Sequence, residues 1–256
     1  MKATSKGDQR FWDRLAEKYA SQPIADQATY EQKLAITRKY LTPESEVFEF
    51  GCGTGSTALL HAPHVRYILA TDVAGNMLDV GRGRAADAGI GNIDFRQTGI
   101  EEYEPRGQQF DVVLGLNILH LCRDPEGVTQ KIHALLKPGG YFIQSTACLK
   151  DASPILRVAV PLMRAIGKAP HVSFLSEEDI LSMLDSNGSE RCACSSSLSA
   201  SVMSSDCRAR SLMPSPRGLS SGLSKMKPNM ARWASSPRLD SPRDHQSESS
   251  SGPSID

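Results

Sequence analysis

The sequence has no net charge, because 29 lysine and arginine residues balance 29 aspartate and glutamate residues. Without an excess of positive charge, nothing steers the chain toward nucleic acid, and a nucleic-acid partner is not expected. No apolar run is long enough to cross a bilayer, and none follows the first residues as in a secretory signal. These absences favour a cytoplasmic protein without a membrane span.

The six cysteines contain no CxxC pair, so the sequence predicts no disulfide framework. Cys192 and Cys194 are one residue apart, but no histidine or further cysteine stands at metal-ligand spacing from them. We therefore expect reduced thiols and no metal site.

Up to Asp185, helical and strand patterns alternate in the order that a parallel sheet requires. Residues 1–42 carry two helical patterns, which predict an N-terminal helical cap, and residues 43–185 carry the remainder of the α/β pattern. The runs at strand length are 47–50, 67–72, 93–96, 110–114 and 141–144. The expected fold class is α/β, with a mostly parallel central sheet and helices on both faces.

Residues 186–256 differ in composition from the preceding chain. Serine is the commonest residue there, and Ser-Pro-Arg recurs without any apolar helix or strand face. Such a segment cannot bury enough surface to offset its ordering entropy, so we expect disorder. The repeats fit two interpretations, a phosphorylatable or weakly basic interaction arm and an out-of-frame product joined to the domain.

The most informative stretch is the turn at residues 51–55 (Gly-Cys-Gly-Thr-Gly), which follows an apolar strand and opens a helix. Glycines let a ligand approach the backbone, and a helix N-terminus offers free N–H groups to an anion. The third glycine of a dinucleotide fingerprint would fall on Ser56, so that fingerprint is incomplete. Glu49 stands two residues before the turn, and the arrangement suits a zwitterion with a carboxylate and an ammonium group.

This turn, together with Glu49, resembles motif I of the class I S-adenosylmethionine-dependent methyltransferases. Segments similar to later family elements follow in family order: Asp72 at the end of the second strand, residues 110–120, and residues 135–142. Residues 11–19 are similar to the N-terminal cap of the UbiE-like small-molecule methyltransferases. The resemblance implies a Rossmann-like fold and S-adenosyl-L-methionine as the cofactor. The strand hairpin that completes the sheet in the family, after the helix at 177–184, is expected to be missing.

The resemblance also implies a set of cofactor-binding residues. The glycines would hold the methionine end, Glu49 its ammonium group, and Asp72 the ribose hydroxyls. The full set is Tyr19, Glu49, Gly51, Gly53, Gly55, Asp72, Val73, Met77, Ile100, Glu101 and Asn117. Each of three members has an alternative role: Tyr19 as a core residue, Glu49 as a solvated strand-end acid, and Asp72 as a helix cap.

Adenine recognition departs from the family pattern. Gly99 occupies the position after the third strand where the family often has an acid for the adenine amino group. Ile100 is expected to pack on the adenine, and Glu101 is the candidate substitute for the acid. Asn117, after the fourth strand, is expected to line the site through its backbone.

The acceptor side is less constrained by the resemblance. His120 follows the fourth strand near the expected reaction centre and is the candidate general base, with a structural role as the alternative. The segment 148–175 is the expected lid, and its apolar stretch 153–166 fits either a lid helix or a core helix.

The sequence thus predicts a methyltransferase that acts on a small, apolar acceptor. Two alternatives remain: a cofactor-binding protein without activity, caused by loss of the hairpin, and an NAD-dependent oxidoreductase. Ser56 argues against the second alternative. The sequence predicts neither the methylated atom nor the oligomeric state.

Overall fold

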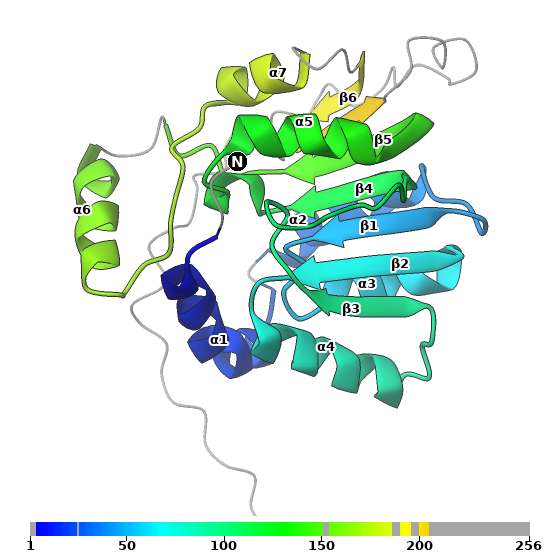
Figure 1. Cartoon of the computed structure of the whole chain (residues 1–256), viewed down its shortest axis with the longest axis horizontal. Coiled ribbons are helices and arrows are strands. Elements are labelled where there is room, and N and C mark those ends of the chain that lie inside the picture. Colours follow the sequence, from blue (N-terminus) through cyan, green and yellow to red (C-terminus); the bar gives the residue numbers. More distant parts are fainter. Residues whose placement is uncertain (1–3, 25, 151–153, 186–189, 196–199, 205–256) are drawn as a thin grey trace, which may run out of the picture. The chain divides into compact units, whose positions relative to one another are not determined.

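The computed structural model describes residues 4–24, 26–150, 154–185, 190–195 and 200–204. The chain divides into two units, residues 1–215 and 216–256, and all described residues belong to the first. One sheet of seven strands forms its centre, in the order β3-β2-β1-β4-β5-β7-β6 (Figure 1). The strands are β1 Glu46–Phe50, β2 Tyr67–Asp72, β3 Ile93–Gln97, β4 Phe110–Leu116, β5 Leu136–Ser145, β6 Glu190–Ser195 and β7 Ala200–Ser204.

Helices surround the sheet and connect its strands. They are α1 Lys6–Ser21, α2 Gln27–Arg38, α3 Ser56–His61, α4 Gly75–Asp87, α5 Pro125–Leu135, α6 Pro154–Ala165 and α7 Glu177–Asp185, with short 3-10 helices η1 Ala62–His64 and η2 Leu119–Leu121. Side chains cap four of the helix starts. Ser5 accepts a hydrogen bond from the Asp8 N–H, Asp26 from the Thr29 N–H, Asp124 from the Gly127 N–H and Ser176 from the Asp179 N–H. None of the described helices combines the length and apolar character needed to cross a bilayer.

Successive residues of a strand point to opposite faces of the sheet, and helices cover both faces. Phe48 belongs to a core that includes Val128 and Ile132 of α5 and Ile180 of α7. Its neighbour Val47 belongs to a second core, which includes Ala58 of α3, and Leu78 and Ala85 of α4. The expected α/β fold with helices on both faces is confirmed.

Strands β1 to β5 are parallel, and the direction of strand order reverses beside β1. The chain runs outward from β1 through β2 to β3, and then returns to place β4 on the other side of β1. In open α/β sheets, ligands bind at the carboxyl ends of strands beside such a reversal. This places the expected site at the ends of β1, β2 and β4.

The expectation of a missing hairpin is wrong. Strands β6 and β7 pair with each other in antiparallel fashion, and β7 also pairs with β5, where Val202 lies opposite Ile143. Hydrogen bonds between strands are made by the backbone, so a serine-rich segment forms them without a run of large apolar residues. The eleven residues of β6 and β7 are described as strands. The expectations for the other residues of 186–256 lie outside the described part of the chain.

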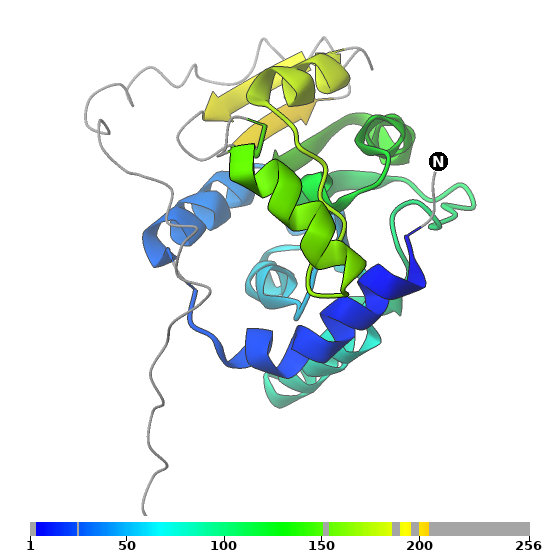
Figure 2. The same cartoon turned by 90° about the vertical axis from the view of Figure 1, so that its left-hand side faces the viewer.

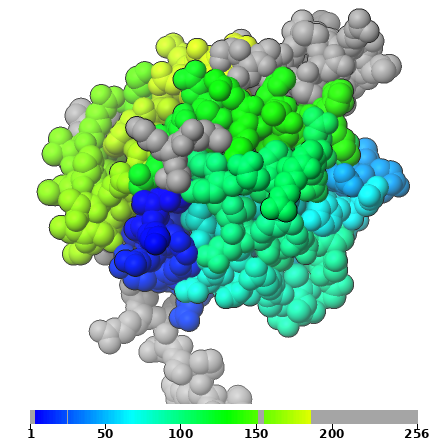
Figure 3. All heavy atoms as spheres, viewed as in Figure 1, coloured from blue at the N-terminus to red at the C-terminus, as the bar shows by residue number. Residues whose placement is uncertain are grey.

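Helix α6 lies on the side of the sheet where β1, β2 and β4 end, together with α1 (Figures 1 and 2). The interpretation of this segment as a core helix is wrong, because Ile155 is 75% exposed and Val158 is 73% exposed. Figure 3 shows α1 and the α6 segment adjoining at the surface, and the Arg14 guanidinium donates to the Gly167 carbonyl there.

Candidate functional site

The glycine-rich turn joins β1 to α3 with a left-handed backbone. Gly51, Gly53 and Gly55 have φ angles of +65°, +55° and +69°, a region that side chains rarely adopt. The three differ in their surroundings. A Cβ on Gly51 would overlap Ile118, and one on Gly55 would lie 2.7 Å from the Phe95 ring. A Cβ on Gly53 would meet nothing nearer than Cε1 of Tyr19, at 4.0 Å. Gly53 is therefore the least crowded of the three glycines.

Asp72 links the end of β2 to this turn. Its Oδ2 accepts a hydrogen bond of 2.8 Å from the Gly53 N–H, and its Oδ1 accepts one of 2.9 Å from the Ala74 N–H. Burial raises the pKa of this carboxyl, while the bonds from Ala74 and Gly53 act in the opposite direction. The contact with Ala74 is of the helix-capping kind, and the contact with Gly53 holds the carboxylate against the turn.

Glu49 is a buried carboxyl group at the end of β1. Glu49 is only 3% exposed, and its Oε2 has no hydrogen-bond partner among the described residues. Burial, and then the charge of Asp72, raise the pKa of Glu49 to about 8. The interpretation of Glu49 as a solvated strand-end acid is therefore wrong. A buried carboxyl without a hydrogen-bond partner suits a cationic partner.

Two expected residues, Tyr19 on α1 and Met77 on α4, depend on how these helices pack. Tyr19 is 51% exposed and stands over Gly53, so it is not a core residue. Met77, on α4, is buried against Ala16 and Trp12 of α1. The packing of α1 on α4 thus fixes Tyr19 beside the turn.

The structure separates the expected adenine-binding residues. A cavity of about 310 Å³ lies at the ends of β2 and β3, and Val73, Thr98 and Gly99 line it. Ile100 lies in the core instead, and Glu101 accepts hydrogen bonds from the Thr4 hydroxyl and the Arg123 N–H.

Glu102, which the sequence analysis did not select, lines this cavity. Its carboxylate accepts a bond of 2.7 Å from the Thr4 N–H. No sequence signal distinguishes the two neighbouring acids, since the bend of the loop decides which one faces the cavity.

A second residue missed by sequence reasoning is Lys33, on α2. Its Nζ lies 3.4 Å from Oδ1 of Asn117, the residue that follows β4 with a φ of +57°. The Asn117 N–H donates to the Ser145 carbonyl at 2.8 Å, so its backbone is held against β5. Burial lowers the pKa of Lys33. A surface helix lysine has no distinguishing sequence pattern, and the packing of α2 alone brings it here.

His120 lies on η2, and its surroundings favour the structural alternative. Burial lowers the pKa of His120 to about 4, and Nδ1 has no hydrogen-bond partner within the part of the chain described. A general base works best with a pKa near the working pH, and this imidazole is a much weaker base. The His120 carbonyl accepts a bond of 2.7 Å from the Ser173 N–H, which attaches the segment after α6 to this loop.

Comparison with known proteins agrees with this geometry. Residues 47–140, which contain the turn, Asp72 and Asn117, match the family described as a methyltransferase domain. This part of the chain is thus similar to class I S-adenosylmethionine-dependent methyltransferases. The chain is 32% identical over 151 residues to a ubiquinone biosynthesis O-methyltransferase of Ruegeria pomeroyi, covering 56% of this chain and 59% of that protein. The corresponding protein of Roseobacter denitrificans is 30% identical over 149 residues, and 58% of it is covered. The chain thus matches somewhat more than half the length of these curated relatives.

Solved structures show the same fold. The YcgJ protein of Bacillus subtilis superposes with a TM-score of 0.55 at 22% identity, covering 64% of this chain and 71% of that one. The [4+2]-cyclase SpnF superposes with a TM-score of 0.61 at 17% identity, covering 75% of each chain. Since one of these is described as a cyclase, the fold by itself does not decide the reaction.

Proposed function

We propose that this methyltransferase-family protein transfers the methyl group of S-adenosyl-L-methionine to a small, apolar acceptor. The observation that carries the proposal is the buried carboxyl of Glu49, whose Oε2 has no partner among the described residues, on the strand that leads into the Gly53 turn, with Asp72 one strand away. This set offers a partner for an ammonium group, space against backbone N–H groups, and a carboxylate for hydroxyls. An amino acid joined to a nucleoside needs these three features together.

The residues of the turn fit the methionine end of this cofactor. Glu49 would take the ammonium group, and the backbone of residues 51–55 would take the carboxylate at the start of α3. Gly51 and Gly55 support the turn through their packing on Ile118 and Phe95. Tyr19 would close over the methionine chain from α1.

The nucleoside end would extend from Asp72 into the cavity of about 310 Å³. Asp72 retains a free lone pair on each oxygen for the ribose hydroxyls. Val73 would contact the adenine, and Glu102 would lie near the adenine amino group. Met77 and Ile100 would support this wall from the core. Glu101 would support it through its hydrogen bonds with Thr4 and Arg123.

The bound cofactor supplies a methyl group on a sulfonium, which is already activated toward a nucleophile. The chain then has to align the acceptor and exclude water, and orientation of this kind contributes roughly 7–11 kcal/mol in intramolecular reactions. We propose that α6 and α1 cover the acceptor, and that Asn117 and Lys33 border the reaction centre. His120 is proposed to support this loop rather than to move a proton.

Of the two alternatives, an inactive cofactor-binding protein loses its expected cause, because the hairpin is present. For an NAD-dependent enzyme, the unpaired Glu49 would face an anionic pyrophosphate, which is unfavourable. We place the protein in the cytoplasm, a proposal supported by the buried thiols of Cys52 and Cys122, which form no disulfide.

Titration calorimetry with S-adenosylhomocysteine tests the donor site. We expect saturable binding to the wild-type chain, and about a hundredfold loss in Asp72→Ala, because two ribose hydroxyls would lose a charged acceptor. Asp79→Ala, on the exposed side of α4, is the matched control and should bind normally. Equal affinity for NADH, or an Asp72→Ala variant that binds like wild type, would contradict the assignment. Methyl transfer itself is measured with labelled cofactor and a metabolite extract.

A further inference from the structure

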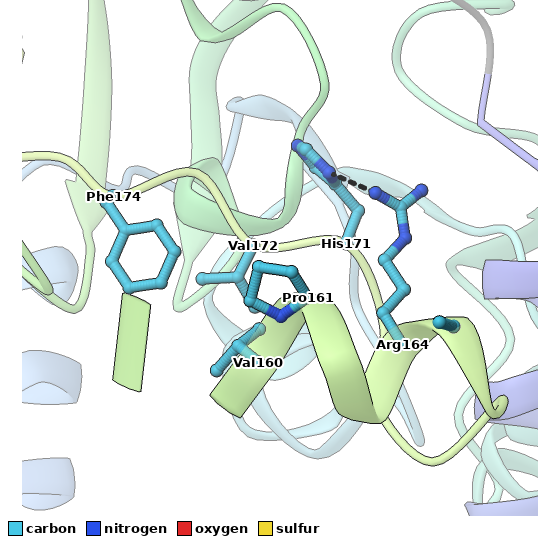
Figure 4. Close-up of a pocket in the computed structure, with 7 residues that line it drawn as sticks. Val160, Pro161, Arg164, His171, Val172 and Phe174 are labelled. Carbon is cyan, nitrogen blue, oxygen red and sulfur yellow. Dashed lines mark hydrogen bonds between the residues drawn. The ribbon is translucent and has the colours of Figure 1, made fainter. Parts of the chain in front are cut away.

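A second cavity, of about 470 Å³, lies between α6 and residues 171–174 (Figure 4). Its volume falls within the range of small-molecule sites. Most of its wall is apolar, with Val160 and Pro161 from α6 facing Val172 and Phe174. Arg164 and His171 stand together at the opposite end from Phe174. The cavity therefore combines an apolar body with one polar end.

Hydrogen bonds fix the protonation of His171 at this end. The Ser173 hydroxyl donates to the Cys122 carbonyl at 2.9 Å, so its oxygen accepts from Nε2–H of His171 at 3.1 Å. Nδ1 then carries the lone pair and accepts from Nη1 of Arg164, also at 3.1 Å. Burial, and then Arg164, lower the pKa of His171, in agreement with a neutral ring. His171 thus has no free N–H for a ligand.

Arg123 and Arg164 both approach one carboxylate, that of Asp8. The only carboxylate in this cluster of Asp8, Arg123, Arg164 and His171 is Asp8, which is buried. Asp8 already accepts a bond of 2.7 Å from Arg123 and one of 2.9 Å from the His171 N–H. Nη2 of Arg164 lies 3.8 Å from the same carboxylate, beyond hydrogen-bond distance. Two guanidinium groups therefore share one carboxylate, and Arg164 is the less well paired of the two.

We propose that this cavity binds a small apolar molecule with a single negative charge, and that the anionic group of this molecule pairs with Arg164. Ser173, in the cavity wall segment, donates to the His120 carbonyl in the loop after β4, which continues from Asn117. This continuity points to the methyl acceptor as the ligand, an assignment that rests on the proposed function. Binding itself does not depend on it.

The test compares two probes of equal shape, 1-naphthoate and 1-naphthamide, by titration calorimetry in a buffer without phosphate. We expect 1-naphthoate to bind the wild-type chain at least about tenfold more tightly, because a charge-assisted bond to a guanidinium is stronger than a neutral one. Arg164→Gln should remove this difference and leave 1-naphthamide unaffected. Arg157→Gln is the matched control, since Arg157 lies on the same helix and donates to the Lys150 carbonyl outside the cavity.

A second variant tests the cavity itself. Ala165→Trp should fill it and abolish binding of both probes, while S-adenosylhomocysteine binding in every variant reports that the domain is folded. Equal affinity for the two probes, no binding of 1-naphthoate to the wild type, or an unchanged preference in Arg164→Gln would overturn the inference. If the wild type does not bind S-adenosylhomocysteine but still prefers 1-naphthoate, only the proposed function would be overturned.

Discussion

The glycine-turn region (Glu49, residues 51–55 and Asp72) and the α6 region (residues 154–175) lie on the same side of the sheet but are built differently. The first is held by backbone and core packing between neighbouring strands, with Asp72 bonded to Gly53 only 19 residues away. The second exposes its apolar side chains and is held by polar contacts with α1, such as that between Asp8 and His171, 163 residues apart. Rigid packing thus supports the glycine-turn region, and a few long-range contacts position the α6 region.

Two glycines with the same φ of +69°, Gly55 and Gly167, provide the largest contrast between these regions. Alanine at either position incurs left-handed strain of about 1 kcal/mol. Gly55→Ala adds overlap with the Phe95 ring, whereas nothing lies within 4 Å of a Cβ on Gly167. We expect Gly55→Ala to lower the free energy of unfolding by about 3 kcal/mol, and Gly167→Ala by about 1 kcal/mol. Urea denaturation measures both, and equal losses would show that packing at the turn is not tight.

An effect of intermediate size is expected in the pH dependence of S-adenosylhomocysteine affinity. With a pKa of about 8, Glu49 is protonated in the free protein at pH 6.5 and must release its proton to pair with the ligand's ammonium group. Affinity should therefore rise by about tenfold between pH 6.5 and pH 8, since each pH unit below the pKa costs a factor of about ten. Calorimetry across this range measures the rise. In Glu49→Gln the profile should be flat, and a flat wild-type profile would remove Glu49 from ammonium binding.

The smallest effect is expected on the exposed face of α6. Ile155→Ala should change the free energy of unfolding by less than about 0.5 kcal/mol, because this side chain is 75% exposed. Ile132→Ala is the matched control on α5, where a buried isoleucine should cost about 3 kcal/mol. Thermal and urea unfolding report both changes. A large loss in Ile155→Ala would show that α6 is packed in solution and does not act as a cover.

Most of the fold could be predicted from the sequence. The run 67–72 is β2 residue for residue, and the runs 93–96 and 110–114 are each extended by one or two residues at their carboxyl ends. Hydrophobic strands between amphipathic helices leave few other arrangements. The hairpin β6–β7 could not be predicted, because its ladder depends on backbone groups and on the free edge of β5 rather than on large apolar side chains.

The sequence by itself determined the turn, its strand and its acidic neighbours, because left-handed glycines and a following helix start are local properties of the chain. Only the tertiary structure decided that Glu49 is buried without a partner among the described residues, and that Glu102 rather than Glu101 lines the cavity at the ends of β2 and β3. It also brought Lys33 to Asn117, and Arg164 to His171. The reason is physical: burial and long-range contact depend on how distant segments pack, and no local pattern specifies them.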